Sequence, residues 1–210
     1  MPKEARRLAV RKVLQLVNKR QFDGVILDWE VPQALDEWRH LANLAKDLGR
    51  NTSVHVTMWP TPANFEKLEE VRDKEGRGIL DFVAAVHLMT YAPGSKQVER
   101  ALSEWSRRGW PLDKLVIGLP FFGEPATPYY DIDVAKATEK DGLLTVGNVR
   151  IDGPRALGRK VARVREAGAR GVMAWELGQD RPVQTGPGVS LLRAVAAAAW
   201  PEQSGTSEEL

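Results

Sequence analysis

The chain has 210 residues, with 30 Lys and Arg against 28 Asp and Glu, so its formal net charge is +2. This balance gives no reason to expect a nucleic-acid partner or an anionic membrane surface. The absence of cysteine excludes a disulfide scaffold, a thiolate metal site and a cysteine nucleophile. Hydrophobic residues make up 43% of the chain, which allows a sizeable core and argues against wholesale disorder.

Length and local composition predict one domain. At roughly 150 residues per domain, the chain is expected to form a single domain over residues 1–200, followed by a disordered tail over 201–210. No apolar run approaches the ~20 residues of a membrane span, so we predict no membrane partner. The charged start, residues 1–13, lacks the apolar segment of a signal peptide. A native N-terminus that lies further upstream would change this, so the localisation stays open.

Helical and strand-like segments alternate along the chain. Residues 4–21 come first and carry an apolar stripe that is typical of an amphipathic helix. Runs rich in β-branched and apolar residues, typical of buried parallel strands, follow at 24–30, 53–59, 82–91, 114–122 and 171–178. Helical patterns follow these runs at 34–49, 64–76, 95–109, 156–171 and 190–200. Residues 123–153, rich in Gly, Pro and Asp, are expected to form an extra loop.

This alternation predicts an α/β fold with a parallel sheet and about five strand–helix units. Five units are too few to close an eight-stranded barrel, which typically takes about 250 residues. From the pattern alone, an open sheet of the doubly wound kind is the plain alternative.

The segment FDGVILDWE, residues 22–30, is the most informative for chemistry. In a strand, residues two apart share a face, so Ile26, Asp28 and Glu30 are expected to point the same way. Two neighbouring carboxylates raise each other's affinity for a proton, which is how a carboxyl group is kept protonated for general-acid work. The alternative is a strand that runs out into a loop with two solvated carboxylates.

The same segment resembles the D-G-x-D-x-D-x-E signature of glycoside hydrolase family 18, the chitinase-like family. Asp23, Gly24, Asp28 and Glu30 match four of its five defined positions. Further resemblances follow in the family's order along the chain, in LMTYA (88–92), KLVIGLPFFG (114–123) and GVMAWELGQD (171–180). The resemblance runs from about residue 5 to about residue 195.

The resemblance implies a (β/α)8 barrel of the TIM type. Here the barrel would be partial, because the chain is similar to the family's strands four to eight and the first three strands are absent. It also implies retaining hydrolysis of β-1,4-linked N-acetylglucosamine glycans, such as chitin, chito-oligosaccharides or cell-wall glycan. The nucleophile would be the 2-acetamido oxygen of the substrate, and no metal or organic cofactor would be needed.

The family's residue roles carry over to matching positions. Glu30 would be the general acid/base, Asp28 would orient the acetamido group, and Tyr91 would hydrogen-bond its oxygen. Trp175 would form the apolar floor under the sugar. The motifs also nominate Met89 and Asp23 as substrate-binding residues. Trp59, at the end of a predicted strand, is either a sugar-stacking platform or a core residue.

The chain departs from the family pattern at several positions. Ile26 and Ala92 stand where the family has aspartates, and Phe122 and Glu124 replace a frequent Tyr and Arg. These departures leave two alternatives to hydrolysis, a non-hydrolytic carbohydrate-binding protein and an inactive barrel fragment. Open sheet edges would also allow self-association.

The remaining aromatic and histidine residues carry weaker signals. We expect core packing for Trp38, Trp105 and Trp110. The histidines, at positions 40, 55 and 87, are widely scattered and form no ligand spacing, so no zinc site is predicted.

Overall fold

The computed structural model describes residues 2–30, 32, 34–182 and 190–201. The chain divides into two compact units, residues 1–89 (unit 1) and residues 90–210 (unit 2). Each unit contains parallel strands and helices, as expected for an α/β fold. From residue 202 onward, the predicted disordered tail lies outside the described residues, and a single domain over residues 1–200 stays a prediction.

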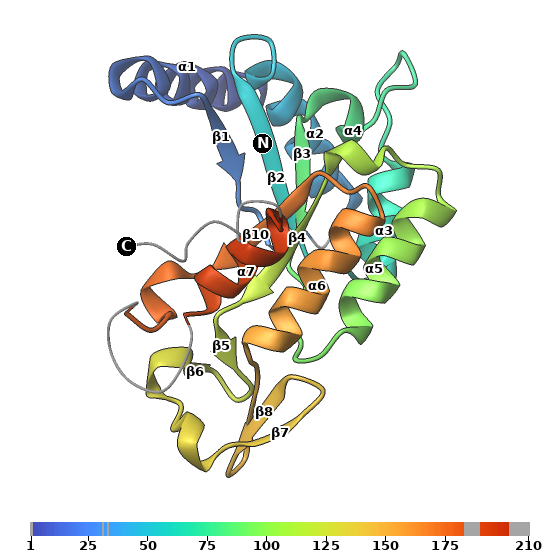
Figure 1. Cartoon of the computed structure of the whole chain (residues 1–210). Helices are drawn as coiled ribbons and strands as arrows, with labels where there is room; N and C mark the ends of the chain where they lie inside the picture. Colours follow the sequence, from blue (N-terminus) through green and yellow to red (C-terminus); the bar gives the residue numbers. More distant parts are fainter. Residues whose placement is uncertain (1, 31, 33, 183–189, 202–210) are drawn as a thin grey trace. The chain divides into compact units, whose positions relative to one another are not determined.

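Unit 1 is built on three parallel strands that lie side by side in Figure 1, with β2 pairing with both β1 and β3. Its elements in chain order are α1 (Lys3–Arg20), β1 (Gly24–Leu27), α2 (Leu35–Leu48), β2 (Ser53–Met58), α3 (Pro62–Glu70), α4 (Ile79–Phe82) and β3 (Ala85–Leu88). The register places Ile26 opposite His55 and Thr57 opposite His87. The predicted strand at 82–91 begins only at Ala85, because residues 79–82 form the helical turn α4.

The core of unit 1 follows from the period of its sequence. Along β2, Val54, Val56 and Met58 are buried, while the residues between them are more exposed. Helix α2 buries residues three and four apart, beginning with Trp38, which is 2% exposed. The core role predicted for Trp38 is therefore confirmed.

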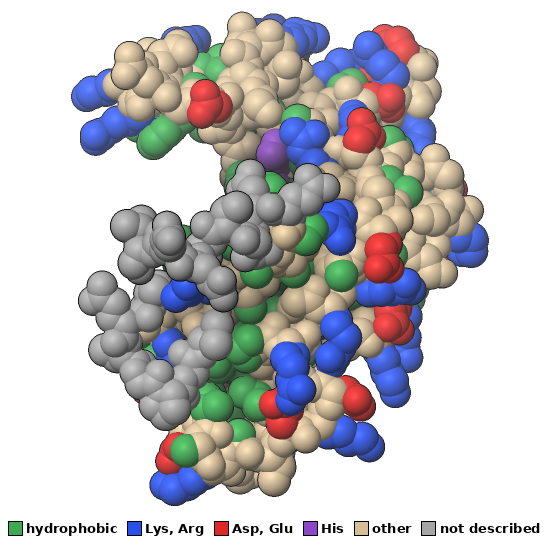
Figure 2. All heavy atoms as spheres, viewed as in Figure 1, with side chains coloured by type: hydrophobic (Ala, Val, Ile, Leu, Met, Phe, Trp, Pro, Cys, Tyr) green, Lys and Arg blue, Asp and Glu red, His purple; other side chains and the backbone are tan. Residues whose placement is uncertain are grey.

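Helix α1 is less buried than its apolar stripe suggests. Val17 is buried, but Leu8 and Leu16 are 47% and 52% exposed. Arg6 ties the helix to α2 through an ion pair with Asp47 at 2.8 Å. Figure 2 shows Lys and Arg side chains gathered along this helix. None of the described helices combines the length and the apolar character needed to cross a membrane.

Unit 2 contains a parallel strand pair and a group of small antiparallel strands. Its main elements are α5 (Lys96–Arg107), β4 (Leu115–Pro120), α6 (Pro154–Glu166), β10 (Gly171–Trp175) and α7 (Leu191–Ala199). Short 3-10 turns lie at Leu112–Lys114, Tyr129–Asp131, Val134–Lys136 and Leu177–Gln179. Strands β4 and β10 pair in parallel, with Trp175 opposite Pro120, and α6 packs along α7 (Figure 1). Trp105, fully buried on α5, confirms its predicted core role.

The prediction of a plain loop over residues 123–153 is wrong. This stretch forms β6 (Thr127–Pro128), which pairs with β5 (Phe122–Gly123), and an antiparallel sheet of β7 (Thr138–Lys140), β8 (Leu143–Val146) and β9 (Val149–Asp152). Gly147, in the left-handed region at φ 59°, and Asn148 link β8 to β9. A Gly-Asn pair between two apolar runs is a hairpin signal that the compositional interpretation passed over.

Candidate active site

Exposure alternates from residue to residue at the strand end that carries the predicted acid/base. Ile26, Asp28 and Glu30 are exposed, whereas Val25, Leu27 and Trp29, which alternate with them, are partly buried. This alternation of exposure agrees with the expected sharing of one face, which stays a prediction. Ile26, which stands where the family has an aspartate, is 54% exposed. Strand β1 ends at Leu27, so both carboxylates lie just beyond its carboxyl end.

Asp28 is held by the neighbouring strand. The Thr57 hydroxyl on β2 donates a hydrogen bond to Asp28 Oδ1 at 2.5 Å. One carboxylate oxygen is thereby fixed, and the other remains available as an acceptor. This arrangement suits a carboxylate that orients a group rather than one that moves.

Glu30 opens onto a pocket of about 290 Å³ within unit 1. The pocket is lined by a carboxyl group, two indole rings and small or polar side chains: Glu30, Pro32, Trp38, Trp59, Thr61, Ala63, Asn64 and Lys67. Asn64 Nδ2 donates to the Trp59 carbonyl at 3.0 Å, and Trp38 Nε1 donates to the Pro32 carbonyl at 3.1 Å. An apolar wall with a few fixed polar groups is the usual make-up of a small-molecule site.

Two further predicted residues of unit 1 lie elsewhere. Asp23 precedes β1, at the end opposite to Asp28, which along an extended chain is about 16 Å away. Met89 is only 4% exposed, and its N–H donates to the Met58 carbonyl at 3.0 Å. Neither residue lines the pocket beside Glu30.

The structure brings together two histidines that the sequence separates. His55 Nδ1 and His87 Nε2 lie 2.8 Å apart, from β2 and β3. Both follow the strand alternation that also places Thr57 on this face, and this period was the signal that could have found them. Among the described residues, no group of three or more His, Asp or Glu is arranged to hold a metal ion.

Unit 2 holds the other predicted site residues. Tyr91 Oη donates to Met173 Sδ at 3.8 Å, and its ring meets Phe122 edge-on at 5.6 Å. Met173 and Trp175 lie two apart on β10, so Tyr91 contacts the strand face that also carries Trp175. Trp175 is 49% exposed at the end of the strand, and its peptide bond to Glu176 is cis.

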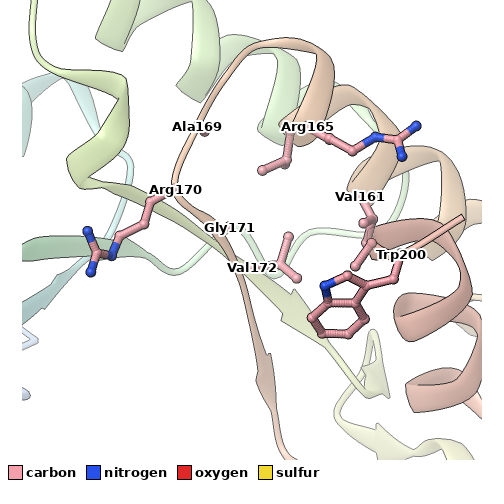
Figure 3. Close-up of a pocket in the computed structure, with 9 residues that line it drawn as sticks. Val161, Arg165, Ala169, Arg170, Gly171, Val172 and Trp200 are labelled. Carbon is pink, nitrogen blue, oxygen red and sulfur yellow. The ribbon is translucent and has the colours of Figure 1, made fainter. Parts of the chain in front are cut away.

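A second pocket, of about 360 Å³, lies at the opposite end of β10 (Figure 3). Its lining includes Val161, Val172 and the Trp200 indole, while the guanidinium groups of Arg165 and Arg170 point away from it. The pocket is therefore apolar, and it belongs to the amino end of the strand rather than to Trp175.

Comparison with known proteins decides the family. Residues 2–180 match the family model of Glycosyl hydrolases family 18. The chain belongs to this family. The prediction that was based on the four sequence motifs is thereby confirmed.

Individual family 18 relatives are distant. The chain is 28% identical to an endochitinase of Manduca sexta over 160 residues, which make up 60% of this chain and 28% of that protein. It covers 50% of the length of a second curated relative. The chain thus spans half or less of the curated relatives that it matches.

Solved structures of family 18 proteins share the fold. Catalytic domain 2 of the Ostrinia furnacalis Group II chitinase matches with a TM-score of 0.75 and 18% identity, over 94% of this chain and 71% of that one. A chitinase-like agglutinin from Robinia pseudoacacia matches equally well, at 0.75 and 19%, over 94% and 74%. The predicted partial (β/α)8 barrel is confirmed, and the doubly wound alternative is set aside.

Proposed function

We propose that this family 18 protein is a chitinase-like retaining glycosidase, with Glu30 as its general acid/base. Its substrates would be β-1,4-linked N-acetylglucosamine glycans. One observation carries the proposal: Glu30, exposed two residues after Asp28, opens onto a pocket that Trp59 also lines. The pocket thus combines a carboxyl group that can act as an acid with a flat indole ring that can pack against a pyranose.

The proposed reaction runs in two steps. In the first, Glu30 gives its proton to the glycosidic oxygen while the substrate's own acetamido oxygen attacks the anomeric carbon, and the leaving sugar departs. In the second, Glu30 takes a proton from water, which opens the cyclic intermediate with retention of configuration. Asp28, held by Thr57, would orient the acetamido N–H and stabilise the positive charge.

Tyr91 and Trp175, in unit 2, take their proposed roles from the family motifs. The Tyr91 hydroxyl would bind the acetamido oxygen. Its present acceptor, the Met173 sulfur, is a weak one, so the exchange for a carbonyl oxygen is favourable. Trp175 would lie under the apolar face of the ring. Substrate contacts of Met89 and Asp23 remain predictions from the family motif, as does independence from any cofactor.

The relatives support a glycan substrate. The Manduca sexta protein is named an endochitinase, and the Ostrinia furnacalis chitinase domain was solved in complex with (NAG)5. A second candidate function is non-hydrolytic carbohydrate binding. Ile26 and Ala92, which replace two family aspartates, favour it, and one structural relative is an agglutinin.

Release of a chromogenic group from short N-acetylglucosamine oligomers, over about pH 4 to 8, tests the proposal with Glu30→Gln. We expect turnover by the wild type and a loss of about a hundredfold or more in the variant. Glu66→Gln, an exposed glutamate on α3, is the matched control and should keep wild-type turnover. If the wild type shows no turnover but still binds the oligomers, as measured by tryptophan fluorescence, the protein is a carbohydrate-binding protein. Neither turnover nor binding would establish an inactive fragment.

A further inference from the structure

Unit 2 contains an ion pair that is shielded from water. Lys160 Nζ on α6 lies 2.5 Å from Asp152 Oδ2 at the end of β9, and the two side chains are 1% and 0% exposed. Burial of two charges is expensive, even when they are paired, and a hydrophobic pair of similar volume would often fold as well. The pair therefore calls for a role beyond holding the fold together.

Both charged groups also bind one short stretch of backbone. Lys160 Nζ donates to the Ala92 carbonyl at 3.2 Å, and the Gly94 N–H donates to Asp152 Oδ1 at 2.8 Å. Both backbone groups follow Tyr91 in the chain, within three residues of it. We call residues 90–94 the tyrosine segment.

The other polar groups of the tyrosine segment are fixed as well. The Thr90 hydroxyl donates to the Gly118 carbonyl on β4 at 2.6 Å, and Gln97 Oε1 accepts from the Ala92 N–H at 2.8 Å. Gly94 adopts φ 86°, a left-handed conformation that favours glycine. Anchors from β4, α5, α6 and β9 thus hold the segment from which the Tyr91 side chain reaches Met173.

We propose that Lys160 and Asp152 are positioning residues for Tyr91 in the glycosidase reaction, an inference that rests on the proposed function. The family aspartate that follows the tyrosine is replaced here by Ala92, so no side chain at this position can fix the segment. The ion pair does so through the Ala92 carbonyl and the Gly94 N–H instead. The antiparallel sheet β7–β9 supplies Asp152 and thereby takes part in the site.

The double variant Asp152→Asn with Lys160→Met tests this role, because it removes both charges and leaves no unpaired buried charge. The matched control is Glu139→Gln with Arg155→Met. That pair, 2.5 Å apart, also joins the β7–β9 sheet to α6, but it is more exposed and does not bind the tyrosine segment.

Amide hydrogen exchange provides the first readout. We expect faster exchange at residues 92–94 in the Asp152/Lys160 variant, with β4 and α5 still protected, and no such change in the control. Unchanged exchange at residues 92–94 would overturn the inference. This readout needs no turnover, so a failure of the inference can be told apart from a failure of the proposed function.

Kinetics in two backgrounds provide the second readout. In the wild-type background the double variant should lower kcat about tenfold to a hundredfold, since a misplacement of about 1 Å can cost that much. In a Tyr91→Phe background the same change should have little further effect, because the hydroxyl that it positions is already missing. An equal loss in both backgrounds would mean a merely structural pair and would overturn the inference.

Discussion

One ion-pair network of unit 1 and one ion pair of unit 2 differ sharply in burial. In unit 1, Asp73 pairs with Lys46 at 2.7 Å and with Arg77 at 3.0 Å, and these side chains are 16%, 23% and 46% exposed. In unit 2, Asp152 and Lys160 are sealed from solvent. The two ion-pair groups therefore differ in energy. Solvent weakens the electrostatic attraction in the first, whereas the attraction within the second is hardly screened.

The same contrast applies to the proposed catalytic side chains. Asp28 and Glu30 are exposed at a strand end, and one hydroxyl, from Thr57, holds the first of them. Tyr91 is partly buried, on a segment that four hydrogen bonds tie to surrounding elements. A group that must exchange protons needs access to substrate and water, whereas a group that only donates a hydrogen bond gains from rigidity.

The largest expected difference between the two units is the loss of stability when one charge of an ion pair is removed. Lys160→Met leaves Asp152 buried without a counter-ion and should lower the free energy of unfolding of unit 2 by about 3–5 kcal/mol. Lys46→Met should cost unit 1 about 1 kcal/mol or less, because the network is partly exposed and Asp73 keeps Arg77 as a partner. Chemical denaturation followed by residue-resolved hydrogen exchange measures both. Equal losses would mean that burial does not distinguish the pairs.

Each unit also has a buried tryptophan that donates a hydrogen bond to the carbonyl of a proline. Trp38 Nε1 and Trp105 Nε1 donate to the carbonyls of Pro32 and Pro111 at 3.1 and 3.0 Å. Trp38→Phe and Trp105→Phe should each cost about 1–3 kcal/mol, since each leaves a carbonyl without its donor.

The two tryptophan variants should differ in activity. Pro32 lies two residues after Glu30, and both line the same pocket. Trp38→Phe is therefore expected to lower kcat, whereas Trp105→Phe should leave kcat within about twofold of wild type. Turnover at saturating oligomer, well below the unfolding temperature, measures this. Equal effects of the two variants on kcat would mean that the hydrogen bond of Trp38 does not support the site.

The smallest effect concerns acid stability in unit 1. The hydrogen bond from the Lys46 ammonium holds the pKa of Asp73 well below its usual range. Because the folded pKa is the lower one, this stabilisation is present above about pH 4 and is lost as the pH falls through the folded pKa. The stability difference between wild type and Asp73→Asn should therefore shrink below about pH 4 in acid titrations of unfolding. A constant difference would contradict this.

Local patterns were enough to predict much of this protein. The period of two predicted the alternating exposure of residues 25–30, because neighbouring side chains of an extended chain alternate. The motifs around Glu30, Tyr91 and Trp175, in the family's order, indicated a partial family 18 barrel; the match over residues 2–180 confirms the family, and the solved structures confirm the fold. Such information lies within a few residues along the chain, where backbone geometry alone relates them.

Only the tertiary structure decided which distant residues meet. His55 and His87 are 32 positions apart, Lys160 and Ala92 68 apart, and Tyr91 and Met173 82 apart. Strand register and helix packing bring them into contact, and neither is encoded in the spacing of one segment. Burial of the Lys160–Asp152 pair is likewise a property of everything packed around it, so no pattern in RKVARVR or VRID could reveal it.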